Sequence, residues 1–211
     1  MAGIVSVTEV LDYSCPPYLA KWFKNNSAAK CDKIGAETAR VGTLVDALIQ
    51  EDIRDGGYVP PEGDEVARNC LMAWESLKRD HPEFVGSVKE MQIEVGAFGV
   101  VGHPDFVNGE NPSWGITDLK CTSGIRSKNW IQEATYARMI MDERGWQMPS
   151  FLRTIRLPQD GKPYEWLEVR DERMIRKLMK MFDGYLAVFH SEKIIGEFFR
   201  TQLEDQMLGG W

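Results

Sequence analysis

The spacing of apolar residues changes after Phe84, and this change constrains the fold more than any other feature of the chain. Before Phe84, apolar residues recur at helical spacing from Ile34 to Arg54 and from Glu65 to Arg79. After it, short alternating runs bounded by turn residues predict strands at 88–95, 100–107, 114–121, 150–157 and 164–169. This order predicts an α/β (α+β) fold with a central mixed sheet of about five strands flanked by helices.

A length of 211 residues suits a single domain, within which three consecutive parts differ in pattern. Residues 1–84 predict a mainly helical lobe that includes a short helix at Tyr18–Asn25. Residues 85–170 predict the sheet together with a helix from about 125 to 143, and residues 171–211 predict a closing helix to about His190 and a tail. Ser6 and Glu9 have the spacing of a capping box at the start of the first helix.

Composition excludes several classes of protein. No apolar run approaches the roughly 18 residues that span a bilayer, and the N-terminus lacks the features of a secretion signal, so a cytoplasmic protein without a membrane partner is expected. The four cysteines are scattered without a Cys-X-X-Cys pair, which predicts reduced, mostly buried thiols. A net charge of −7 is unfavourable for binding DNA, but local basic clusters, including Arg153 and Arg156, offset it.

Two acidic motifs carry the strongest chemical signal. Gly102-His103-Pro104-Asp105 is followed thirteen residues after Asp105 by Asp118-Leu119-Lys120. Alternate residues of a strand share a face, so Asp118 and Lys120 project together while Leu119 turns into the core. If the two strands pair through the turn at 108–113, Asp105 lies beside Asp118, and two such carboxylates repel unless a cation joins them. The alternative is a solvated strand face next to an ordinary turn.

Three residues on predicted helices extend this pattern. Gln132 and Tyr136 are four residues apart on the helix that follows Lys120, so they share a helical face. Asp46 lies on a helix that is otherwise apolar on one side, where a buried carboxylate needs a cation or a partner. Exposure of Asp46 to solvent is the alternative. Gln50, one turn further on, can help from the same face.

These motifs together resemble those of a known superfamily. Pro104-Asp105 and Asp118-Leu119-Lys120 resemble the signature of the PD-(D/E)XK nucleases. Gln132 with Tyr136 resembles the Gln-X-X-X-Tyr motif of the RecB-like exonuclease branch, and residues 42–46 resemble its Gly-Thr-X-X-His motif, with Asp46 in place of the histidine. The resemblance covers most of residues 5–170 and implies a restriction-endonuclease-like core with an N-terminal helical lobe.

The resemblance implies a metal-dependent DNA exonuclease that hydrolyses phosphodiester bonds. Asp46, Asp105, Asp118 and the backbone carbonyl of Leu119 are expected to bind Mg²⁺ or Mn²⁺, and Lys120 to orient the attacking water and stabilise the developing charge. Gln132 is expected to contact the phosphate or hold the lysine. Contacts with DNA are expected from Thr122, Ser123, Arg126, Lys128, Trp130 and Tyr136. An iron–sulfur cluster is not expected, because no cysteine follows Cys121.

Two alternatives remain open from the residues alone. One is a structure-specific endonuclease of the same superfamily, and the other is a catalytically inactive DNA-binding or assembly module. The expected partners are single- or double-stranded DNA ends, together with a recombinase or annealing protein. The expected setting is DNA recombination, repair or processing in the cytoplasm, or in the host cytoplasm if the chain is phage-encoded. An oligomer is compatible with the sequence.

Overall fold

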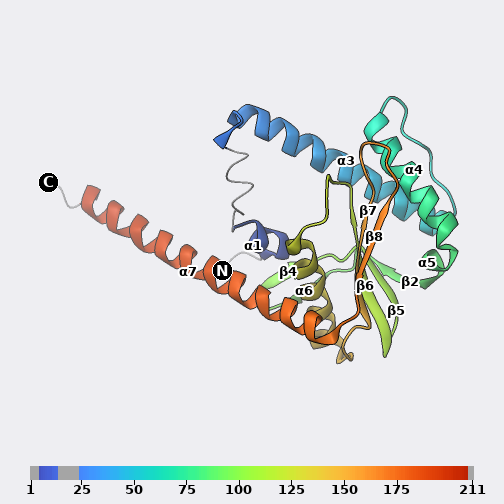
Figure 1. The fold of residues 1–211 in the computed structure, drawn as a ribbon. Helices are drawn as coiled ribbons and strands as arrows, with labels where there is room; N and C mark the ends of the chain where they lie inside the picture. Colours follow the sequence, from blue (N-terminus) through green and yellow to red (C-terminus); the bar gives the residue numbers. More distant parts are fainter. Residues whose placement is uncertain (1–4, 14–23, 209–211) are drawn as a thin grey trace.

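The computed structural model describes residues 5–13 and 24–208, with side chains as far as Glu197. Its main element is a five-stranded mixed sheet (Figure 1). The strands, in spatial order, are β2 (Val88–Met91), β5 (Phe106–Glu110), β6 (Ser113–Lys120), β7 (Phe151–Arg156) and β8 (Glu165–Val169). Only β6 and β7 run parallel, and the other neighbours are antiparallel. The predicted mixed sheet of about five strands is confirmed.

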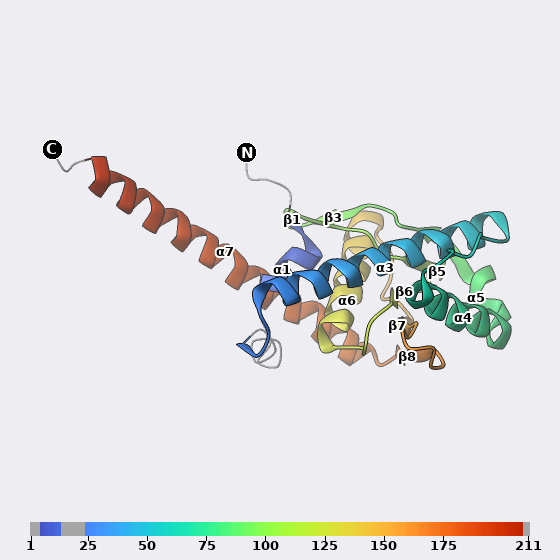
Figure 2. The ribbon, with the colours of Figure 1, turned by 90° about the horizontal axis from the view of Figure 1, so that it is seen from above.

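Helices cover both faces of this sheet, as Figures 1 and 2 show. The helices of one face are α3 (Ala28–Asp55), α4 (Glu65–Asp80) and α5 (Pro82–Ser87). Those of the other face are α1 (Val7–Tyr13), α6 (Ser127–Arg144) and α7 (Glu172–Leu208). A separate hydrophobic core lies on each face of the sheet, and β6 contributes side chains to both. Trp114 and Ile116 pack toward α6, while Leu119 packs toward α3 and α4. No helix of the described residues is long and apolar enough to cross a membrane.

The runs predicted as strands at 88–95 and 100–107 pair antiparallel with each other, which makes them a hairpin, but they divide between two sheets instead of forming continuous strands of one. β2 pairs with β5, whereas β3 (Val95–Ala97) pairs with β4 (Val100–Gly102) in a small sheet completed by β1 (Val5–Ser6). The chain leaves the main sheet at Gln92, which has a φ of 49°. Its N–H donates to the carbonyls of Pro104 and Asp105. A left-handed residue interrupts strand geometry, and alternation of side chains does not reveal it.

The remaining helices were predicted with mixed success. The N–H of Glu9 donates to Ser6 Oγ at 3.0 Å, which confirms the capping pattern at the start of α1. Helix α7 continues to Leu208, well past the predicted end near His190. The predicted helix at Tyr18–Asn25 lies almost entirely outside the described residues, as does Cys15. The other three cysteines, Cys31, Cys70 and Cys121, are free and buried as expected.

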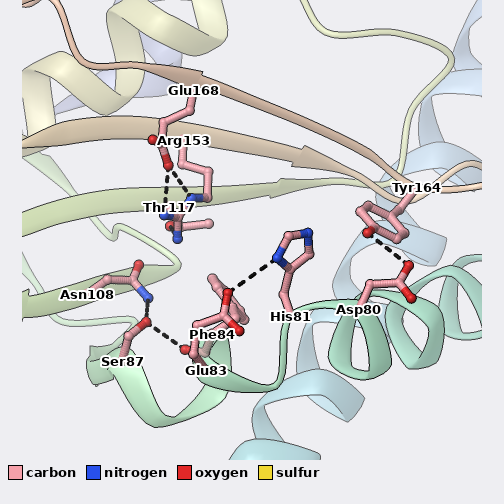
Figure 3. Close-up of polar contacts among 10 residues, drawn as sticks. All are labelled: Asp80, His81, Glu83, Phe84, Ser87, Asn108, Thr117, Arg153, Tyr164 and Glu168. Carbon is pink, nitrogen blue, oxygen red and sulfur yellow. Dashed lines mark hydrogen bonds and ion pairs between the residues drawn. The ribbon is translucent and has the colours of Figure 1, made fainter.

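Aromatic and charged side chains lie between the sheet and helices α4 and α5 (Figure 3). The Arg153 guanidinium lies 4.1 Å from the ring of Trp166 and 4.3 Å from that of Phe151, and it donates twice to Glu168. His81 stacks on Trp166 at 4.3 Å. Arg153 is therefore a structural cation held by aromatic rings and a carboxylate. The sequence pattern counted Arg153 among the basic residues that offset the net charge of −7. Its guanidinium is already paired with Glu168, so it supplies no free positive charge for DNA.

Candidate active site

Two of the predicted acidic residues meet at the ends of strands β5 and β6. Phe106 pairs with Thr117 in the antiparallel ladder, so Asp105, one residue before Phe106, lies next to Asp118. Asp118 and Lys120 share the α6 side of β6, and Lys120 Nζ lies 2.5 Å from Asp118 Oδ2. Leu119 turns to the opposite core and is 8% exposed. The structure thus brings these residues together as strand geometry predicts.

Helix α3 adds Asp46 to the same place. Its core side carries Val41, Val45 and Ile49, which are fully buried against the sheet. Asp46 follows Val45 and faces a pocket of about 200 Å³ between α3 and the end of β6. The pocket is lined by polar and small residues, among them Thr38, Gly42, Asp46, Asp105, Lys120 and Thr122. Three segments far apart in sequence therefore supply the polar residues of one small pocket.

Gln92 joins two of the carboxylates, and the sequence analysis did not identify it. Its side-chain amide donates to Asp105 Oδ1 at 2.8 Å and to Asp46 Oδ2 at 3.2 Å. Asp46 Oδ2 also accepts from Gln50 at 2.9 Å, in agreement with the expected help from that residue. The N–H of Leu119 donates to Asp105 Oδ2 at 2.7 Å. The sequence pattern predicted one continuous strand at 88–95, with Gln92 inside it. That pattern gave no reason to expect the side chain of Gln92 beside Asp105, at the start of β5.

Burial and mutual repulsion shift the pKa values of this group. Burial raises the pKa of Asp46 to about 7, with a further contribution from Asp105. Burial also raises the pKa of Asp118 to about 7, against the effect of Lys120, and raises that of Asp105. Burial alone would lower the pKa of Lys120, but Asp118 and Asp105 raise it above its usual value. The ammonium of Lys120 stays protonated, but this single positive charge does not balance the negative charge that the three carboxyl groups would carry when ionised.

The side chains present fit a hard divalent cation. Asp46 Oδ1 and Asp118 Oδ2 are buried without a hydrogen-bond partner, and Asp118 Oδ2 has only the ion pair with Lys120. Mg²⁺ and Mn²⁺ prefer such carboxylate oxygens. Among the described residues, however, no three acidic, histidine or cysteine side chains already stand in a metal-binding arrangement. The amide of Gln92 donates a hydrogen bond to Asp105, and the ammonium of Lys120 pairs with Asp118. These two groups stabilise part of the negative charge of the site.

Gln132 and Tyr136 lie together on α6, as their spacing predicts. Gln132 Nε2 donates to the Tyr136 hydroxyl at 2.8 Å and to Thr8 Oγ1 at 3.4 Å. Tyr136 is only 3% exposed, and burial raises its pKa to about 12. Its ring lies against Gly102, the last residue of β4 and the first of the Gly102-His103-Pro104-Asp105 motif. Tyr136 thus bonds to Gln132 and packs on the backbone of β4, and its contact with DNA stays a prediction.

Glu133 is a second residue near the site that sequence reasoning missed. It is fully buried, its Oε1 accepts from the Thr154 hydroxyl, and its Oε2 has no hydrogen-bond partner. Thr154 pairs with Asp118 across β6 and β7, so Glu133 lies behind the acidic group. Burial, followed by repulsion from Asp118, raises its pKa well above the usual value. A glutamate between Gln132 and Ala134 on an amphipathic helix gives no signal of this burial.

The other residues expected to contact DNA surround the start of α6. Thr122 lines the pocket, Ser123 is exposed on the following loop, and Arg126 is the exposed N-cap residue of α6. Lys128 Nζ lies 2.5 Å from Asp12 Oδ1, so its charge is already paired. Trp130 is partly buried and packs against the core under α6. The ring of Trp130 is thus partly packed in the core and the charge of Lys128 is paired with Asp12, and contact of either residue with DNA stays a prediction.

No protein-family model matches the sequence, and no curated protein matches it significantly. Among solved structures, an alkaline exonuclease from Laribacter hongkongensis is 14% identical, with 94% of each chain covered and a TM-score of 0.42. The same enzyme in complex with dAMP gives a TM-score of 0.43 at 14% identity, with 94% of each chain covered. A candidate exonuclease from Eubacterium rectale is 16% identical over 74% of this chain and 68% of its own, with a TM-score of 0.47.

The strand order and the position of the helices identify the fold independently of these comparisons. A mixed five-stranded sheet lies between α3–α5 on one face and α6–α7 on the other. The acidic residues lie at the ends of its central strands. This arrangement is consistent with the restriction-endonuclease-like core that the resemblance to PD-(D/E)XK nucleases implies.

Proposed function

We propose that this chain is a divalent-metal-dependent deoxyribonuclease, and more specifically an exonuclease of the RecB-like type. One observation carries the proposal. Asp46, Asp105 and Lys120, from three segments far apart in sequence, line one small pocket, and Asp118 adjoins it through its ion pair with Lys120. Burial of several carboxylates is unfavourable for folding, so a site of this kind is expected to gain its stability and its use from a bound cation.

The protein groups proposed to hold Mg²⁺ or Mn²⁺ are the three carboxylates and the backbone carbonyl of Leu119. The cation, when bound, would offset their repulsion and favour negative charge on the phosphate oxygens of DNA. Gln92 now donates to Asp46 and Asp105, so its amide is expected to turn away from at least one of them on loading. Asp105 keeps its N–H donor from Leu119, which fixes the orientation of that carboxylate.

Lys120 is proposed to act on the reacting groups directly. Its side chain is 20% exposed, reaches the pocket, and remains protonated because of Asp118 and Asp105. A protonated lysine beside the scissile phosphate would orient the attacking water and stabilise charge on the non-bridging oxygens. The ion pair with Asp118 keeps the ammonium in place before DNA arrives.

The substrate is proposed to enter along the loop between β6 and α6. Thr122, Ser123 and Arg126 lie within six residues after Lys120 and border the pocket or the exposed start of α6. Gln132 is proposed to hold the DNA backbone or the lysine, supported by its bond to Tyr136. A recombinase or annealing protein is the proposed partner in DNA recombination, repair or processing.

The proposal is tested by cleavage of end-labelled linear and closed circular DNA, single- and double-stranded, with Mg²⁺ or Mn²⁺. Lys120→Ala is compared with the wild type, and Lys162→Ala, which removes a lysine from the exposed β7–β8 turn, is the matched control. Loss of linear DNA only, absent in Lys120→Ala and kept in Lys162→Ala, is the expected result. Unchanged cleavage by Lys120→Ala would show that Lys120 does not take part in the reaction.

Two other outcomes separate the alternatives. Cutting of closed circles, abolished by Lys120→Ala, identifies an endonuclease built on the same site. Absence of cleavage on every substrate, with DNA binding retained, identifies an inactive binding or assembly module. The buried carboxylates favour an active enzyme, since a module without chemistry has no physical need to keep them together.

A further inference from the structure

Helix α7 extends well beyond the rest of the molecule in both ribbon views (Figures 1 and 2). Its first half packs on the body through buried residues that end at Phe189. From that residue to Leu208 the helix continues without a buried residue among those whose side chains are described, which end at Glu197. An isolated helical segment of this kind is marginally stable in water unless another surface packs against it.

An apolar stripe runs along α7 at intervals of seven residues. Its members are Met174, Met181, Val188 and Ile195, which are 45%, 41%, 52% and 48% exposed. A strict seven-residue repeat keeps its members on one side of a helix that winds around a second helix. The stripe starts beside the body and continues onto the extended segment, so one partner helix can cover its whole length.

A groove beside the stripe provides room for such a helix. Val10 and Tyr13 of α1 form one wall, and Met181, Tyr185 and Val188 form the other, around a pocket of about 400 Å³. Gly184 lies at the middle of the stripe and within this groove. No atom lies within 4 Å of the position a Cβ would take on Gly184, so a second helix can approach the backbone closely there.

The charges of α7 indicate which helix fits. Residues 172–180 contain four basic residues and one acidic residue, whereas residues 189–197, which would face them in an antiparallel pair centred near Gly184, contain two acidic residues and one lysine. A second copy of α7 in the antiparallel direction would place each acidic half beside a basic half. A parallel copy would place like charges side by side, which is unfavourable.

We propose that the stripe is a dimerisation surface, on which α7 of a second copy of this chain packs in the antiparallel direction. Met174 of one copy then faces Ile195 of the other, Met181 faces Val188, and the two Gly184 residues lie at the crossing. The proposal does not depend on the nuclease assignment, because none of these residues lines the acidic pocket.

The first experiment measures the mass of the full chain by light scattering over a range of concentrations. Wild type is expected to be a dimer that dissociates on dilution, and Ile195→Glu is expected to be monomeric. Ala187→Glu is the matched control, because Ala187 is exposed on α7 but off the stripe. Both variants should keep the wild-type melting temperature at high dilution. A monomeric or trimeric wild type, or a dimeric Ile195→Glu, would overturn the proposal.

The second experiment tests the direction of pairing by cross-linking. Met174→Cys and Ile195→Cys are made separately in a chain in which Cys15 is replaced by serine, since the other three cysteines are buried. Mild oxidation of the mixture is expected to give disulfide-linked heterodimers, while neither variant alone cross-links. Cross-linking of each variant alone would show parallel pairing and contradict the antiparallel arrangement.

Discussion

The ring of Tyr136 occupies the space where a side chain on Gly102 would stand. A Cβ at residue 102 would fall 2.2 Å from Cε1 and 2.9 Å from Cδ1 of that ring. Tyr136 in turn accepts a hydrogen bond from Gln132, and Gly102 is three residues before Asp105. One close contact therefore links helix α6 to the strand that leads into the acidic pocket.

Gly102→Ala is expected to displace Tyr136 and, through it, Gln132. Overpacking of this kind costs about 1–3 kcal/mol of stability, and small displacements near a reactive group reduce rates by about 10- to 100-fold. Chemical denaturation and the cleavage rate measure the two effects. Gly86→Ala is the control, because a Cβ at Gly86 meets no atom within 4 Å. Full activity in Gly102→Ala would show that the position of Tyr136 does not matter for the site.

Gln92→Asn is expected to destabilise the metal-free protein. Asparagine tolerates the positive φ of residue 92 but is too short to reach both Asp46 and Asp105. Loss of a buried donor to charged groups costs about 1–3 kcal/mol. Urea denaturation with EDTA should show this loss, and saturating Mn²⁺ should reduce the difference from wild type. An equal loss with and without Mn²⁺ would show that Gln92 and the cation do not serve the same carboxylates.

Divalent cations are expected to raise the melting temperature, and Asp118→Asn is expected to remove most of this rise. A ligand that binds only the folded state at about 100 times its Kd stabilises it by about 2.7 kcal/mol. Thermal melts with Mg²⁺, Mn²⁺ or EDTA measure the effect without any DNA. Asp160→Asn, in the exposed β7–β8 turn, is the control for charge. A cation effect that is the same in Asp118→Asn and Asp160→Asn would place the bound ion elsewhere.

Glu133→Gln is expected to make stability less dependent on pH. Burial raises the folded-state pKa of Glu133 well above the unfolded value of about 4.5, so above that pH the folded protein keeps a proton that the unfolded chain releases. Stability from this group is therefore full at low pH and falls as pH rises toward the folded pKa. The slope is at most about 1.4 kcal/mol per pH unit.

The measurement is urea denaturation of wild type and Glu133→Gln from about pH 5 to pH 8. Glutamine keeps the shape of the side chain but does not titrate, so the stability of the variant relative to wild type should increase steadily with pH. A difference that stays constant over this range would show that Glu133 is not protonated in the folded protein. Hydrogen bonding of the Thr154 hydroxyl is retained in either case, because the glutamine carbonyl can still accept.

Local patterns determined most of the elements and the first half of the site. The alternation around Ile116 and Leu119 correctly placed Asp118 and Lys120 on one face of β6, because successive residues of a strand point to opposite faces. The helical spacing of Val41, Val45 and Ile49 likewise predicted the core side of α3. These features depend on residues close together in the chain, and periodicity reports them directly.

Only the tertiary structure decided which distant residues share the pocket and which are already paired. The position of the Gln92 side chain depends on the left-handed conformation that Gln92 itself adopts after the end of β2. The burial of Glu133 depends on how α6 packs on β7. The pairing of Lys128 with Asp12 depends on where α1 lies. Each of these contacts joins segments whose approach is set by the packing of two cores. Sequence spacing alone describes one segment at a time, so it determined the candidate chemistry but not the environment that tunes it.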